Sequence, residues 1–350
     1  MAELERAYRI MHEDALRPFV ERLMAQMQVV APQEHDTKFA YKPLARFEDM
    51  RLDYVRTLLP MKKVMFPQRE PFLRFSLEGQ PQAEAVTDGE PTALIGVHPC
   101  DAHAIWCLDT AFSDNHADPN YLARRSQMLI IGSDCMPDEY CFCASMGTHL
   151  PRHGYDLFLT DIGDKYTVEI ATARGQQALA GAEGLAEPTA ADFEAQDDSR
   201  RRKVEAMQER VNIEVSRLPL LLSGAWDSKV WQQEAERCYS CGSCNLVCST
   251  CFCFDVLEEV TLDLKGGARE RQWDSCMLEG FAKVASGENF RPTREGRLRH
   301  RLCRKMQYLF TRYGEVFCTG CGRCSQVCLV KIQPPKIINL LVEESAGRAV

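Results

Sequence analysis

Apolar and polar residues follow regular patterns along the first 225 positions of this 350-residue chain. Residues 16–30 have the apolar spacing of a helix, whereas residues 38–44 alternate as a strand does. Residues 93–97 and 128–131 are short apolar runs that predict buried strands, and residues 102–112 have helical spacing. Helices and strands that follow one another in this way predict an α/β-type domain.

Further along the first half, residues 155–162 and 165–170 flank a Gly-Asp pair, which predicts a tight hairpin. Residues 181–198 are rich in Glu, Asp, Ala and Pro and predict a surface loop. The charged residues 199–217 predict a helix that links the two halves of the chain.

From about residue 226 the chain has few strand signals. Residues 226–237 predict a helix, and helix-like segments cover residues 255–264, 277–285 and 297–313. The second half is therefore expected to be mainly helical.

One cysteine pattern, C-x2-C-G-x-C-x2-V-C, occurs twice in this half. Bacterial ferredoxins bind 4Fe-4S clusters with this spacing, and the fourth cysteine of each motif usually ligates the other cluster. The glycine, which has no side chain, lets the backbone approach the inorganic sulfide of the cluster. We therefore expect two clusters, the first bound by Cys238, Cys241, Cys244 and Cys328 and the second by Cys318, Cys321, Cys324 and Cys248.

Zinc sites and disulfides are the alternatives for these cysteines. Structural zinc prefers two ligand pairs with a long gap between them, which the repeated run of four does not provide. Disulfides need an oxidising compartment, yet the N-terminus is charged from its third residue and lacks a signal peptide's apolar core. The cysteine count is also odd, at 17. We therefore expect a cytoplasmic protein whose thiols bind metal.

The two motifs lie far apart, whereas compact two-cluster ferredoxins keep them close together. A long helical spacer instead suggests a ferredoxin-type module of a multi-subunit oxidoreductase. The predicted fold class is α+β, with an N-terminal α/β domain over residues 1–225 and a mainly helical ferredoxin-like dicluster domain over residues 226–350.

Four more cysteines lie in the first half, in loops that follow two strand candidates. The carboxyl ends of such strands are where α/β domains place their sites. Buried free thiols are common, but a C-F-C tripeptide puts two sulfurs on one turn with little packing reason. We expect a third 4Fe-4S cluster, bound by Cys100, Cys135, Cys141 and Cys143.

A second C-F-C, Cys251 to Cys253, follows the first motif, and Cys276 comes later. These three cysteines are candidates for an additional metal site completed by Cys303, His300 or a residue of a partner. They are also candidates for lining the dicluster pocket or for supplying it with an alternative ligand. The sequence does not decide between these alternatives, and we favour those without a fourth cluster. The isolated Cys107 and Cys303 are expected to be core residues.

Composition narrows the function classes. No run approaches 18 apolar residues, so no membrane span is expected, and the formal net charge of −8 disfavours nucleic acid as a partner. An arginine-rich stretch, residues 291–305, is either a docking face or a solvated helix face that offsets the clusters' charge, and we favour the second.

Nucleotide-binding fingerprints are missing from the sequence. It contains no G-x-G-x-x-G after a strand and no phosphate loop. Clusters alone move electrons one at a time, so the residues indicate a non-catalytic electron-transfer subunit that needs partners at both ends.

Several motifs together resemble one family, the β subunits of cytoplasmic NiFe sulfhydrogenases and the corresponding subunits of anaerobic sulfite reductases. They are residues 99–104, 141–147, 159–164, 238–253, 271–277 and 318–328. The likeness covers roughly residues 90–335. One departure is Ser249, which stands where a proline commonly follows the fourth cysteine.

The resemblance implies a subunit with several 4Fe-4S clusters that exchanges electrons with an FAD- and NAD(P)-binding reductase subunit. The other end of the relay in this family is a NiFe hydrogenase, through its small subunit, or a sirohaem sulfite reductase or a heterodisulfide-reductase-type assembly. The alternative is a reductase subunit that itself binds sulfite or polysulfide at an open cluster iron, most plausibly in the N-terminal domain.

Overall fold

A mixed eight-stranded sheet forms the centre of the first half of the chain. The computed structural model describes residues 6–347. The charged residues 1–5, which argue against a signal peptide, lie outside the described residues, as do residues 348–350 of the expected second domain. The sheet has the strand order β10-β1-β9-β8-β7-β6-β2-β3. Its strands are β1 (Ala7–His12), β2 (Gln28–His35), β3 (Lys38–Pro43), β6 (Thr92–Val97), β7 (Met128–Ser133), β8 (Leu157–Asp161), β9 (Lys165–Ile170) and β10 (Leu185–Ala186).

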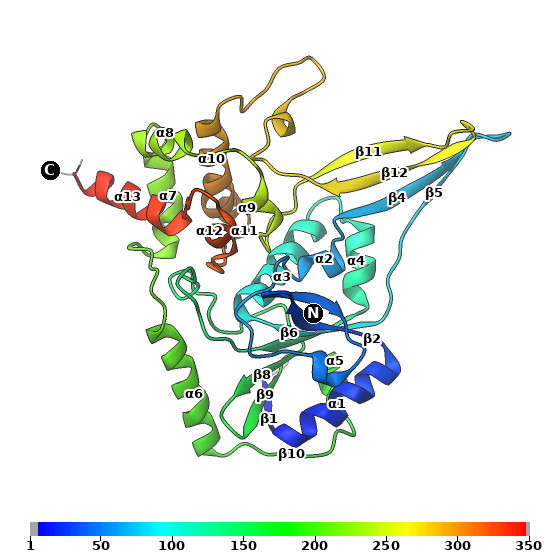
Figure 1. Ribbon diagram of the computed structural model, residues 1–350, viewed down its shortest axis with the longest axis vertical. Helices are drawn as coiled ribbons and strands as arrows, with labels where there is room; N and C mark the ends of the chain where they lie inside the picture. The colour runs from blue at the N-terminus through cyan, green and yellow to red at the C-terminus, as the bar shows by residue number, and fades with distance from the viewer. Residues whose placement is uncertain (1–5, 348–350) are drawn as a thin grey trace.

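Four neighbouring strands of this sheet, β2, β6, β7 and β8, run parallel, and the outer pairs are antiparallel. Helices cover both of its faces (Figure 1). They are α1 (Glu13–Gln26), α2 (Lys62–Met65), α3 (Pro99–Ser113), α4 (Pro119–Ser126), α5 (Ala173–Leu179) and α6 (Ala190–Glu205), with a short 3-10 turn, η1 (Phe47–Asp49).

Alternation along the parallel strands builds one core on each face. Ile95 and Ile131 pack with α1, whereas Leu94 and Ile130 pack with α3. All four side chains are fully buried, as is expected for parallel strands that are covered on both sides. The predicted strands at residues 93–97 and 128–131 and the hairpin ending at residue 170 are therefore confirmed.

The second half is a helical body, as expected, and it lies above the sheet in Figure 1. Helix α10 continues through a π-helical turn, η4, into α11, which confirms the predicted helix over residues 297–313. The helical body also includes η2 (Val215–Arg217) and α7 (Leu218–Gly224), which lie before the expected boundary at residue 226 and pack into its core. Its other elements are α8 (Lys229–Glu236), α9 (Ser243–Leu246), η3 (Gly280–Ala282), α10 (Arg294–Cys303), η4 (Arg304–Tyr308), α11 (Leu309–Tyr313), α12 (Arg323–Val327) and α13 (Pro334–Gly347).

Several local predictions are wrong in whole or in part. The helix expected over residues 16–30 ends at Gln26, that over residues 199–217 ends at Glu205, and that over residues 277–285 is only the 3-10 turn η3. Helix α6 begins at Ala190, inside the expected surface loop, because Thr189 and Asp192 form a capping box there. The helix expected over residues 255–264 is a strand, β11 (Phe254–Val260). The order of its apolar and polar residues fits the period of a helix as well as that of a strand. Backbone pairing with β12 (Gly266–Trp273) makes the segment a strand.

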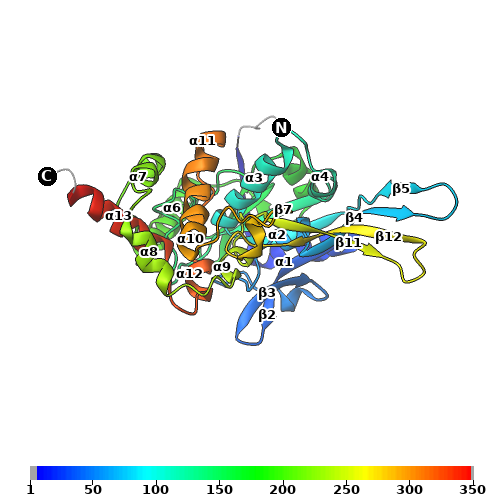
Figure 2. The same cartoon turned by 90° about the horizontal axis from the view of Figure 1, so that it is seen from above.

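These two strands join a second sheet that contains both halves of the chain. Its order is β11-β12-β4-β5, and β4 (Arg69–Ser76) and β5 (Gln82–Ala85) come from the first half. The sheet extends from the body as an arm (Figure 2). The two halves are therefore joined by backbone hydrogen bonds as well as by side-chain packing.

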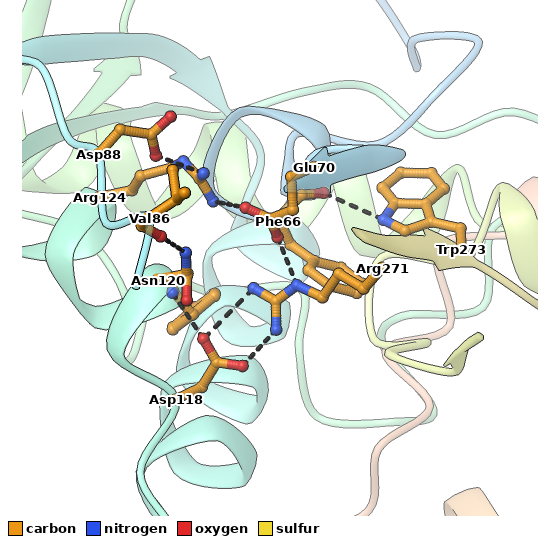
Figure 3. A network of polar contacts seen from close by, with 10 residues as sticks. Phe66, Glu70, Val86, Asp88, Asp118, Asn120, Arg124, Arg271 and Trp273 are labelled. Atoms are coloured by element: carbon orange, nitrogen blue, oxygen red, sulfur yellow. Dashed lines mark hydrogen bonds and ion pairs between the residues drawn. The ribbon is translucent and has the colours of Figure 1, made fainter. Parts of the chain in front are cut away.

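Buried ion pairs fix the base of this arm to the first half (Figure 3). Arg271 of β12 pairs with Glu70 of β4 and with Asp118, which caps α4. Arg124 of α4 also pairs with Glu70. The Trp273 indole N–H donates to the carbonyl oxygen of Phe66 at 3.1 Å. Arg271 and Glu70 are 3% exposed, so neither charge could be solvated by water if its partner were removed.

Replacing Arg271 by methionine should therefore lower the free energy of unfolding by up to about 3–5 kcal/mol, because Asp118 loses this cation and Glu70 keeps only Arg124. The control is Arg269→Met on the same strand, whose pair with Glu258 is exposed and should be worth about 0–1 kcal/mol. Anaerobic urea denaturation of both variants measures the difference. Equal losses would contradict this account of the arm's base.

Candidate iron-sulfur cluster sites

The second predicted cluster has its four cysteines around one void. Cys248, Cys318, Cys321 and Cys324 all line it. Arg301 and Lys305 line it too, and both are buried. Four thiolates around an inorganic core carry net negative charge, so buried cations at the wall fit such a group. The residues present therefore fit a 4Fe-4S cluster.

The first predicted cluster has its ligands at the surface end of the helical body. Cys241 is exposed, and its neighbour Tyr239 is 67% exposed. The sulfurs of Cys238 and Cys328 each accept a backbone N–H at 3.3 Å, from Ser240 and Ile332. Such N–H bonds to sulfur are among the features that set the potential of a cluster.

The third predicted set lies at the carboxyl ends of the parallel strands. Cys100 begins α3 directly after β6, and Cys135 follows β7. These two cysteines line one void together with Cys141 and Cys143. The loops that follow two neighbouring parallel strands thus bring four thiols together, as strand order and direction imply.

Arg56 gives an independent test of whether this void fits an anionic group. It lines the void and its side chain is 7% exposed. Its Nη2 pairs with Asp138 and also donates to the sulfur of Cys141 at 3.2 Å. Within residues 6–347 its Nε and Nη1 have no hydrogen-bond partner. A buried guanidinium with free N–H groups at a four-thiol void fits an iron-sulfur cluster.

Burial changes the protonation of these thiols. It raises the pKa of Cys135 to about 12 and that of Cys318 to about 12. Because the thiolate is the metal ligand, iron would have to displace these protons as it binds. Over residues 6–347, no three His, Cys, Asp or Glu side chains are arranged to hold a single metal ion.

The second and third voids meet at one residue. Cys321 lines both of them. The loop that carries it packs against the C-F-C loop, where the backbone N–H of Phe142 donates to the carbonyl oxygen of Gly320 at 2.9 Å. The Thr148 hydroxyl donates to the carbonyl oxygen of Thr319 at 2.6 Å. Two sets of four thiols therefore lie side by side.

Glycines in the second motif make this approach possible. Gly320 and Gly322 have φ of +65° and +73°. A Cβ on Gly320 would lie 2.7 Å from the backbone of Cys143, and one on Gly322 would lie 2.5 Å from the carbonyl oxygen of Tyr140. The glycine of this motif is thus close to the N-terminal cysteine loop. This contact is a second reason for a glycine at this position, and the cysteine spacing alone does not reveal it.

A buried ion pair joins the same two regions. Asp101, next to Cys100, accepts two hydrogen bonds of 2.6 Å from Arg323, next to Cys324. The Ser249 hydroxyl donates to the same carboxylate at 2.6 Å. Burial alone would raise the pKa of Asp101, but Arg323 and these hydrogen bonds lower it below its ordinary value. The serine that replaces the customary proline therefore completes a buried network.

The arginine-rich stretch is only partly solvated. Arg297, Arg301 and Lys305 are buried, which corrects the expectation of a solvated helix face for this side of α10 and η4. Arg301 donates to the side-chain oxygen of Asn245 at 3.0 Å, and Lys305 donates to Thr250 at 2.7 Å. The sequence pattern could not show that these cations face inward, because their spacing also suits an exposed helix.

The remaining cysteines divide into two groups. Cys251, Cys253 and Cys276 line a further void, whereas Cys107 and Cys303 are fully buried among apolar side chains, as expected. His300 lies against the ring of Tyr308. Neither His300 nor Cys303 lines the void, so the structure gives no support to their completing a site there.

Substitution of Asp101 by asparagine should cost about 3–5 kcal/mol of unfolding free energy and reduce the iron bound per chain, because Arg323 stays buried without a counter-charge. Asp114→Asn, at the other end of α3, is the control. Its partner Arg312 is 52% exposed, so about 0–1 kcal/mol is expected. Anaerobic denaturation and iron analysis measure both. A D101N protein with normal stability and iron would refute the role given to this pair.

Gly320→Ala should lower both stability and iron content, because the methyl group meets backbone atoms of the C-F-C loop. Gly314→Ala isolates the cost of the left-handed conformation, since Gly314 has φ +77° and its added Cβ meets nothing within 4 Å. That control should lose about 1–2 kcal/mol and keep its iron. If the two variants lose the same stability and iron, the close approach of the loops is unimportant.

Comparisons with known proteins agree with this geometry. The model of a 4Fe-4S dicluster domain family matches residues 237–332, which include both cysteine motifs. The chain is 34% identical over 330 residues to sulfhydrogenase 2 subunit beta of Pyrococcus furiosus, and the alignment covers 94% of this chain and 96% of that protein. In residues 6–347, no helix is both long and apolar enough to cross a membrane.

Proposed function

The chain belongs to the family of sulfhydrogenase beta subunits and is an iron-sulfur electron-transfer subunit, and on this premise we propose what it connects. It relays electrons between a terminal catalytic subunit and an FAD- and NAD(P)-binding reductase subunit. The terminal partner is a NiFe hydrogenase, which docks through its small subunit. The next candidates are a sirohaem sulfite reductase and then a heterodisulfide-reductase-type assembly. The relay works in the cytoplasm.

The observation that carries the proposal is the shared wall between the second and third voids. Cys321 lines both voids, so clusters bound in these voids would be separated by a single residue. The dicluster motif pairs the second cluster with the first. Three clusters in a row are what a relay of single electrons needs.

Both ends of this row are open to partners. At one end Cys241 of the first cluster is exposed. At the other end Cys135 lines the third void and also an open groove, to which α1 contributes Arg17 and α6 contributes Arg202. These two faces are where we place the reductase and the terminal catalytic partner.

Four N-terminal cysteines line the third void, one for each iron of a cubane, and Cys321 of the second set lines it as well. This supports a role in the relay for the N-terminal cluster. It gives no support to the alternative in which sulfite or polysulfide binds an open iron there. No observation on the described residues favours that alternative for the N-terminal domain.

The three clusters should contribute about 12 Fe per chain. Cys143→Ser should remove about 4 of them, whereas Cys303→Ser, which changes a core cysteine that lines none of the cysteine-lined voids, should remove none. Anaerobic iron analysis tests this. Stoichiometric zinc, or iron unchanged in Cys143→Ser, would contradict the proposed third cluster.

Co-purification from the native host identifies the terminal partner. A nickel-containing partner supports the first assignment, and a sirohaem-containing partner replaces it with the second. Recovery of the chain without any other oxidoreductase component would overturn the relay.

A further inference from the structure

Three cysteines outside the relay surround a void of their own. Cys251, Cys253 and Cys276 line one void, as the cysteines of the second and third predicted sets line theirs. We propose that this void holds a fourth 4Fe-4S cluster, bound by these three thiolates and with one iron not ligated by cysteine. The proposal goes beyond the three-cluster relay and depends on it only for the neighbouring second cluster.

The hairpin of the arm places these cysteines together. Cys253 comes directly before β11 and Cys276 follows the end of β12. Phe254 pairs with Trp273 across the ladder, and the backbone N–H of Asp274 donates to the carbonyl oxygen of Cys253 at 3.0 Å. Strand register thus fixes the two cysteines on either side of the same opening.

Buried cations line the void, as they do at the second cluster. Arg301 and Lys305 are shared between the two voids, and Arg304 lies at this one. From the first half, buried Lys62 donates to the carbonyl oxygen of Cys251 at 2.6 Å. The π-helical turn η4, which contains Arg304 and Lys305, is of a kind that often marks functional sites. Three thiolates around an iron-sulfur core are anionic, and this wall offsets their charge.

An amide is also aimed at one of the sulfurs. Asn245 is 1% exposed, and its Nδ2 donates to the sulfur of Cys276 at 3.0 Å. Its oxygen accepts from Arg301 Nε at 3.0 Å, which fixes the direction of the amide. A buried N–H directed at sulfur is the interaction that cluster ligands commonly receive.

No cysteine, histidine or carboxylate stands at the fourth corner. Beyond the three cysteines, the side chains of the described residues that line the void are amide, hydroxyl, cationic or apolar. The fourth iron would therefore take a small exogenous ligand. A competing interpretation is a dithiol pair, because the side chains of Cys253 and Cys276 share a hydrogen bond. The side chains of Cys251 and Cys248 share a hydrogen bond too, so Cys251 also faces the second predicted site. The third sulfur at this void favours a cluster over a dithiol.

The first test is native mass spectrometry of the anaerobically purified full chain, combined with iron and sulfide analysis. Four clusters and about 16 Fe per chain are expected. Three clusters and about 12 Fe would overturn the fourth cluster and leave the relay intact, so the two proposals fail separately. One zinc ion per chain in place of the fourth cluster would also overturn it.

Variants locate the site. Cys276→Ser and Cys251→Ser should each lose about 4 Fe and keep the clusters of the relay, whereas Cys303→Ala should lose none. The retained iron shows that each variant folds. Iron equal to that of the unchanged chain in both variants would refute the assignment.

Thiol labelling distinguishes the dithiol. The chain is denatured without reduction, and its peptides are examined for a disulfide between Cys253 and Cys276. If that disulfide is found and Cys276→Ser loses no iron, the site is a redox-active thiol pair instead. Mild oxidation gives a positive signature, because a cubane with a non-cysteine iron loses that iron easily. The resulting three-iron signal in electron paramagnetic resonance should be present in the unchanged chain and absent from Cys276→Ser.

Discussion

The buried ion pair between Asp101 and Arg323 is the constraint on which the arrangement of the cluster sites depends. It joins two residues 222 positions apart, and each is adjacent to a cysteine of a different predicted cluster. A buried pair is costly to break because each charge has lost its water. The pair therefore fixes the third cluster site against the second, and Ser249 supplies a further hydrogen bond from the first motif.

Electrostatics accounts for much of the remaining architecture. An acidic chain with a formal charge of −8 nevertheless directs Arg56, Lys203, Arg301 and Lys305 inward. Each lines a void surrounded by cysteines. Placing cations there stabilises reduced clusters, since hydrogen bonds, burial and net charge are what set the potential of such a centre.

Residue spacing predicts the parts of the structure that are local. The cysteine spacing predicts which four cysteines line the second void. The apolar runs before Cys100 and Cys135 predict that the third group lies at the ends of parallel strands. Nonlocal features were not predictable from the pattern. The segment of strand β11 predicts a helix, whereas its pairing with β12 decides its conformation. The Asp101–Arg323 pair likewise has no local signature, although the serine after Cys248 marked an unusual position.

The central claim is that the clusters form one connected row with the second cluster in its middle. Electron paramagnetic resonance of the anaerobically reduced chain tests it most directly, because reduced clusters that lie close together couple magnetically. The account predicts broadened, interacting signals that separate into narrow independent ones when Cys318→Ser removes the middle cluster. Narrow, uncoupled signals in the unchanged chain, fully reduced and with all its iron, would contradict it.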